Sequence, residues 1–119
     1  MESILTSIKK LLGIAEDYEP FDPEIIMHIN STLFILNQLG VGPDTPFSIS
    51  DKSTTWNDFL GSDISNLEAV KTYVATKVKL MWDTSTMSSA AMEAAKNLIS
   101  EMEWRLNIAV DPKREENNE

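Results

Sequence analysis

The sequence contains no cysteine and only one histidine among its 119 residues. The lack of cysteine excludes disulfides and thiolate metal sites, and the compartment cannot be inferred from redox chemistry. His28 follows Glu24 at a spacing that shares a helix face, but a metal site needs three or four ligands and no second cluster supplies them. We therefore expect no metal and no cofactor, and we expect the histidine at a helix cap or at the edge of the core.

Signals of catalysis and of membrane insertion are also missing. The chain has no glycine-rich phosphate loop, no nucleophile elbow and no EF-hand loop. Glu101 and Glu103 are two positions apart on a predicted helix, so they point to different sides. No run approaches the roughly 18 apolar residues of a membrane span, and the amino-terminal residues lack the order of a signal peptide. We expect a single-domain protein that is not an enzyme, has no membrane partner and is made in a cytoplasm.

Basic residues are outnumbered, with 10 lysines and arginines against 19 acidic residues and a net charge of −9. Duplex binding needs clustered basic side chains, so this balance argues against a protein that grips duplex DNA. Residues 21–64 carry six acids and one lysine, whereas Ser65–Trp82 carries three lysines and one glutamate. This basic face either balances acidic neighbours within the fold or turns toward an acidic surface of another subunit.

The segment Ser65–Trp82 is predicted to be the central helix of the fold. Its main apolar stripe follows helical spacing and comprises Leu67, Val70, Val74, Val78 and Met81. A second, weaker apolar edge, formed by Ala69, Tyr73 and Leu80, lies roughly opposite that stripe. A helix with two apolar edges must be covered on both sides, either within a bundle or by another protein.

Two helices are predicted before this segment. The first spans residues 3–12 and stops at Gly13. The second begins at Asp22-Pro23-Glu24, where Asp22 is a candidate cap, and runs to Leu39. Met27 and Phe34 lie opposite its core stripe, so this helix also has a second apolar patch.

Residues 40–58 form a long irregular segment. Phe47 and Ile49 belong to a short extended stretch, and Trp56 begins a turn of helix that returns the segment to the core. A loop of this length either binds a partner and is mobile in a monomer, or lies as a structural cover over the bundle.

A last helix is predicted from about Ser88 to Asn107, after a connection at 83–87. Trp104 lies off its core stripe, and it is either an isolated surface tryptophan or an interface anchor. Asp111-Pro112 is expected to end the helix, and the acidic tail over residues 111–119 is expected to be disordered because it has no apolar residue to bury.

Several segments, taken in order, resemble the head–tail connector family of tailed bacteriophages, also called head-completion or adaptor proteins. They are ILTSIKKLLGI, FDPEIIMHINSTLFILNQLGVGP, TTWNDFLG, LEAVKTYVATKVKLMWD and EMEWRLN, and they cover nearly the whole chain. The resemblance implies an all-α fold, a small bundle of about four helices with a long loop between the second and the central helix. It also implies one helical connector domain over residues 1–110 and no catalytic residues.

The resemblance further implies a ring, typically dodecameric, that sits under the portal protein in the virion, extends the DNA channel and docks the stopper or tail. DNA would pass through without specific binding. As candidate residues of the subunit or portal interface we name Met27, Phe34, Phe47, Ile49, Trp56, Tyr73, Lys77, Lys79, Leu80 and Trp104. The alternative is a small acidic helical module that binds and regulates a cytoplasmic partner, and an enzyme that depends on His28 ranks far below both.

Overall fold

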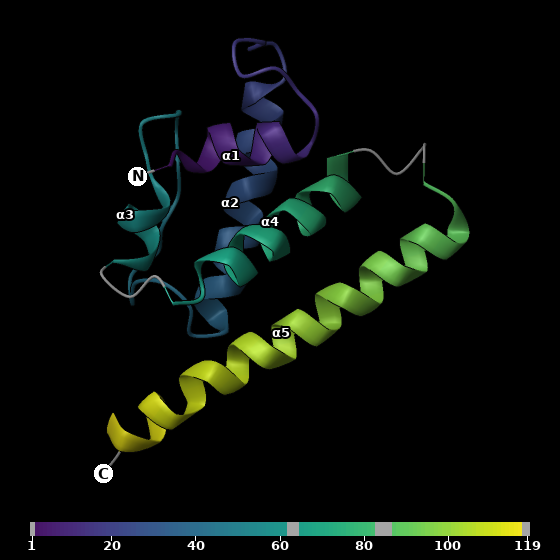
Figure 1. Ribbon diagram of the computed structural model, residues 1–119. Helices are drawn as coiled ribbons and strands as arrows, with labels where there is room; N and C mark the ends of the chain where they lie inside the picture. The colour runs from purple at the N-terminus through teal and green to yellow at the C-terminus, as the bar shows by residue number, and fades with distance from the viewer. Residues whose placement is uncertain (1, 62–64, 83–86, 118–119) are drawn as a thin grey trace.

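The computed structural model describes residues 2–61, 65–82 and 87–117. In this part of the chain the elements are α1 (Ile4–Leu11), α2 (Asp22–Gln38), α3 (Trp56–Leu60), α4 (Leu67–Trp82) and α5 (Ser89–Asn117) (Figure 1). The described residues form no strand, and an isolated antiparallel bridge joins Ser3 to Thr55. The predicted all-α bundle with a long loop before the central helix is confirmed.

Helix α4 is the central element of the bundle. It packs against α1, α2 and α5, and its contact with α2 is the most extensive. Figure 1 shows α2 crossing behind α4, and α5 running beside α4 and continuing past it toward the carboxyl terminus. The molecule is accordingly elongated, with principal extents of 48 × 35 × 20 Å.

The connector between α1 and α2 is held by a buried lysine. Lys9 is 2% exposed, and its ammonium donates to the carbonyl oxygens of Glu16 at 2.9 Å and Tyr18 at 2.7 Å. The same nitrogen lies 2.8 Å from Oδ1 of Asp22. The prediction that Asp22 caps α2 is therefore wrong: the cap residue is Phe21, which forms no side-chain cap bond, and the Asp22 carboxylate is directed to Lys9 instead.

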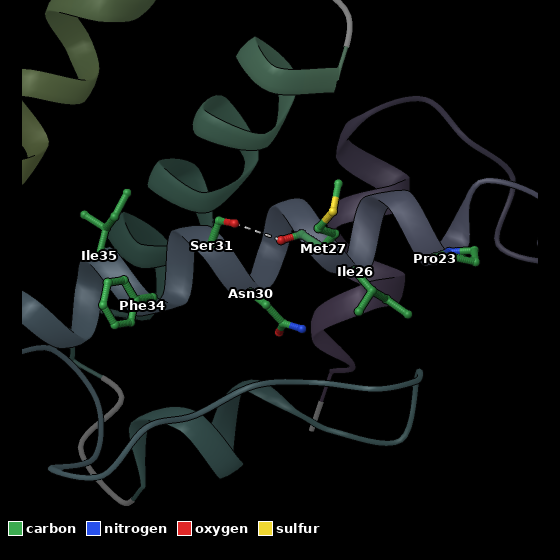
Figure 2. Close-up of a pocket in the computed structure, with 7 residues that line it drawn as sticks. All are labelled: Pro23, Ile26, Met27, Asn30, Ser31, Phe34 and Ile35. Carbon is green, nitrogen blue, oxygen red and sulfur yellow. Dashed lines mark hydrogen bonds between the residues drawn. The ribbon is translucent and has the colours of Figure 1, made fainter.

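The loop between α2 and α3 is fastened to α2 and to the start of α1. Asn30 accepts a hydrogen bond from the Ile49 amide at 2.7 Å and donates one to the Ile49 carbonyl at 3.0 Å. Figure 2 shows the Asn30 side chain directed from α2 toward this loop. Farther along, the Ile4 amide donates to the Thr54 carbonyl at 3.0 Å. These anchors favour the interpretation of the loop as a structural cover.

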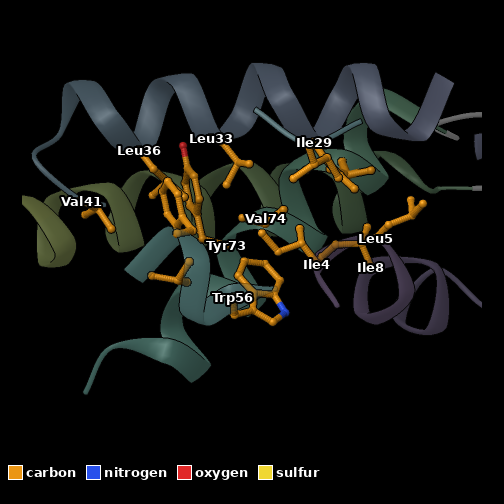
Figure 3. Packing of buried hydrophobic residues seen from close by; sticks show 14 of the residues in the cluster. Ile4, Leu5, Ile8, Ile29, Leu33, Leu36, Val41, Trp56, Tyr73 and Val74 are labelled. Atoms are coloured by element: carbon orange, nitrogen blue, oxygen red, sulfur yellow. The ribbon is translucent and has the colours of Figure 1, made fainter. Parts of the chain in front are cut away.

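The core lies where α1, α2, α3 and α4 meet (Figure 3). Its largest fully buried side chains are Trp56, Tyr73, Phe59, Ile4, Ile8, Ile25, Ile29, Leu33, Leu36, Val70, Val74 and Val78. Trp56 has no exposed surface, and its indole nitrogen donates to the Ser7 hydroxyl at 2.9 Å. A buried indole with a satisfied donor is a stable anchor, which explains how the five-residue helix α3 is fixed in place.

Two predicted features of the helices are wrong. On α4, Met81 was predicted in the core stripe but is 39% exposed, whereas Tyr73 of the second edge is fully buried where α5 packs against α4. At the other end, α5 continues through Asp111-Pro112 to Asn117 instead of stopping there. The predicted connection at 83–87 lies outside the described residues except for Met87, and the expected disorder of residues 111–119 stays a prediction.

Candidate subunit interface

An apolar surface runs along the side of α2 that faces away from the core. This α2 outer face is lined by Pro23, Ile26, Met27, Asn30, Ser31, Phe34 and Ile35 (Figure 2). Met27 is 58% exposed and Phe34 is 59% exposed. The spacing predicted this second patch correctly, and the structure adds the neighbouring side chains that turn two residues into a continuous, open and nearly flat apolar surface.

The position of this face follows from the packing of α2. Ile25, Ile29 and Leu33 lie on one side of the helix and are fully buried. Met27 and Phe34 are about half a turn from that stripe at 3.6 residues per turn, so they point into solvent. A large apolar side chain at this exposure typically marks a contact surface when several lie together.

The polar groups of the α2 outer face are already occupied. The Ser31 hydroxyl donates to the Met27 carbonyl at 3.1 Å, and the Asn30 amide is bonded to Ile49. Glu24 borders the face and lies 3.9 Å from the His28 imidazole. The face therefore offers apolar contact and one acidic edge, which suits docking of another protein surface better than chemistry on a small molecule.

A second exposed aromatic is on α5. Trp104 is 64% exposed, and it lies on the side of the helix away from the buried Ile99 and Leu106. Its neighbour Arg105 is bonded to Glu101 at 2.8 Å, one turn earlier. The prediction that Trp104 lies off the core stripe is confirmed, whereas its role as an interface anchor stays a prediction.

The contact between α4 and α5 is polar at its centre. The Tyr73 hydroxyl donates to the Glu103 carboxylate at 2.6 Å, and the Lys77 ammonium lies 3.8 Å from the same carboxylate. Burial, and then the bond to Glu103, raise the pKa of the Tyr73 hydroxyl. Tyr73 and Lys77 thus act within the subunit, and of the two alternatives for the second apolar edge of the central helix, cover within the bundle holds at Tyr73, because α5 occupies that side.

The remaining candidates divide between core and surface. Ile49 and Trp56 are buried, and Phe47 is half-buried with its ring 5.1 Å from that of Phe59. Lys79 is exposed and Leu80 is partly buried. Met27 and Phe34 are the candidates that the structure brings together on one open surface. Sequence reasoning missed Lys9. Helical spacing places it at the edge of the apolar stripe, but a lysine there is expected to extend its ammonium into solvent.

The described residues include no group of three or more histidine, cysteine, aspartate or glutamate side chains that could hold a metal ion. None of the helices in the described part of the chain has both the length and the apolar character needed to cross a bilayer. Among the described residues, the α2 outer face is the clearest candidate site, because its exposed apolar side chains suit the docking of another protein surface.

Comparisons with known proteins give a family assignment. Searches against curated proteins and against solved structures return no significant match. The family model described as "Phage connector protein" matches residues 4–113, which is nearly the full length of the chain. A match of this extent, over a fold whose helices follow the expected order, shows that the chain belongs to the phage connector protein family, whose members are structural components of the virion.

Proposed function

We propose that this connector assembles into a ring of identical subunits below the portal protein, extends the DNA channel of the capsid and provides the docking surface for the stopper or tail. The observation that carries this proposal is the α2 outer face, an apolar surface that α2 turns away from the subunit's own core. A closed ring needs such surfaces, because each subunit must contact a neighbour on both sides.

The charge of the chain supports the same role. A net charge of −9 leaves little attraction for phosphate groups, since affinity for DNA depends on clustered lysine and arginine. A channel wall that repels DNA weakly lets the duplex slide through, whereas a basic wall would hold it. The described residues also supply no metal cluster that would indicate hydrolytic chemistry.

The experiment is to mix the purified chain with the portal protein of the same phage and to measure the mass of the product by native mass spectrometry. The proposal expects a complex that holds a fixed, large number of connector chains per portal ring. A chain that stays monomeric at high concentration and does not join the portal would contradict it. That result would favour the alternative, a small regulatory module for a cytoplasmic partner.

A further inference from the structure

A groove lies on the side of α4 opposite α2. This α4 groove has walls from three helices and is lined by Leu11 of α1, by Ala75, Thr76, Lys79 and Leu80 of α4, and by Ala95 of α5. Leu11 is 55% exposed and Leu80 is partly buried, so apolar surface remains open along it. Lys79 is exposed, and no described residue forms an ion pair with it.

The α4 groove and the α2 outer face lie on opposite sides of the subunit. Helices α2 and α4 pack against each other, and Leu33 of α2 and Val74 of α4 are both fully buried in the core. Lys79 is about half a turn from the buried stripe of α4, and Phe34 is about half a turn from that of α2, at 3.6 residues per turn. The two surfaces therefore face in opposite directions from the paired helices.

We infer that the α2 outer face of one subunit docks in the α4 groove of a second copy, head to tail. This inference rests on the proposed function and names the contact that would build the ring. One surface is an exposed helix face with Met27 and Phe34 projecting from it, and the other is concave and apolar. Surfaces that differ in shape and face opposite ways give a heterologous contact, which closes into a ring when the rotation per subunit permits.

Charge selects a second copy of the chain as the occupant of the groove. Glu24 borders the α2 outer face with a side chain that is 57% exposed, and its Oε1 atom lies 3.9 Å from Nε2 of His28. Lys79 is in the groove without a partner in the described part of the chain. Docking brings Glu24 at the acidic edge toward Lys79 in the groove, which favours this orientation over contact between two α2 faces, where Glu24 would meet its own copy.

The chain has no cysteine, so introduced thiols report this contact directly. Ser31 lies on the α2 outer face and Thr76 in the α4 groove, and exchange of each hydroxyl for a thiol is conservative. The S31C/T76C variant, oxidised at high protein concentration, should form a ladder of disulfide-linked oligomers on non-reducing gels. The single variants S31C and T76C, mixed in equal amounts, should form dimers and nothing larger, because each chain then carries one thiol.

The matched control is S31C/S100C. Ser100 is also exposed, but it lies beside Lys77 and Met81 between α4 and α5, outside the groove. This variant should give no ladder. Three results would each overturn the inference. The first is a ladder from the control as strong as that from S31C/T76C, and the second is no ladder from S31C/T76C. The third is S31C alone forming dimers as efficiently as the mixture of S31C and T76C.

A charge exchange tests the orientation. In the S31C/T76C background, E24K or K79E should each lower ladder formation by about tenfold, and the two together should restore it. If the double exchange fails to restore the ladder, charge pairing does not select this contact and the inference is overturned.

If the portal recruits the chain but the thiols of S31C/T76C do not cross-link on it, this inference fails while the proposed function stands. If the portal does not recruit the chain, the proposed function fails, while a ladder from the chain alone still supports the docking mode.

Discussion

The hydroxyl group of Tyr73 on α4 donates a hydrogen bond of 2.6 Å to the carboxylate of Glu103 on α5. The residues are 30 positions apart, and the bond lies at the junction of the bundle with its longest helix. We expect Tyr73→Phe to lower the free energy of unfolding by about 1.5–3 kcal/mol, the range for a hydrogen bond to a charged group. Urea unfolding followed by circular dichroism measures this, and a loss below about 0.5 kcal/mol would show that the bond does not fix α5.

The same bond predicts a dependence on alkaline pH. Burial and the Glu103 carboxylate raise the pKa of Tyr73 above the ordinary value of 10.0, so the folded state keeps a proton that the unfolded state releases. Its contribution to stability is complete below about pH 10 and is lost as the pH rises toward the folded-state pKa. The wild type should therefore lose stability above pH 10 more steeply than Tyr73→Phe, and parallel pH profiles for the two proteins would exclude this origin.

Lys9 provides a prediction about the α1–α2 connector. Lys9→Met removes the donor to two carbonyl groups and leaves Asp22 without its partner. Breaking a buried ion pair from one side costs about 3–5 kcal/mol, so we expect a loss of about 3 kcal/mol because Asp22 is partly exposed. Lys10→Met is the matched control, since Lys10 is exposed, and it should stay within about 0.5 kcal/mol of the wild type. Equal losses in both variants would contradict the role of Lys9.

The α2 outer face predicts a separation of folding from assembly. Met27→Ala and Phe34→Ala remove side chains that are more than half exposed, so each should change stability by about 0.5 kcal/mol or less. Both should weaken assembly on the portal. Leu33→Ala, one residue from Phe34 but fully buried, should instead cost about 2–5 kcal/mol. A large loss of stability from Phe34→Ala would place that side chain in the core.

The loop after α2 can be tested through Asn30. Asn30→Ala removes both hydrogen bonds to Ile49, so the Ile49 amide should exchange with deuterium faster in the variant than in the wild type. The sequence predicts rapid exchange over residues 41–55 in a monomer if the loop binds a partner. Protection of Ile49 in the wild-type monomer would instead support the structural cover that its anchors favour.

The helices could be predicted from sequence because their signals are local. Apolar spacing and the positions of Gly13 and Pro23 define α1 and α2, and the same spacing places Met27 and Phe34 outside the core. Tyr73 could not be placed this way. Its position depends on α5, which covers that edge of α4, and the contact with Glu103 joins residues that no local pattern connects.

The buried lysine shows the same limit from the polar side. Lys9 is next to Lys10 in the sequence, and although helical spacing puts Lys9 nearer the apolar stripe of α1, this place at the edge of the stripe does not by itself predict full burial. Only the path of the connector brings the carbonyl groups of Glu16 and Tyr18 and the carboxylate of Asp22 within reach of one ammonium group. The α4 groove is likewise assembled from α1, α4 and α5, so no single segment predicts it.

Electron microscopy of this chain mixed with the portal shows whether the chain builds a ring there. We expect an added ring of density, coaxial with the portal and open along the DNA channel, that disappears when Phe34→Ala and Met27→Ala are combined. Portal particles without added density in the presence of excess wild-type chain, or density that is confined to one side of the axis, would contradict it.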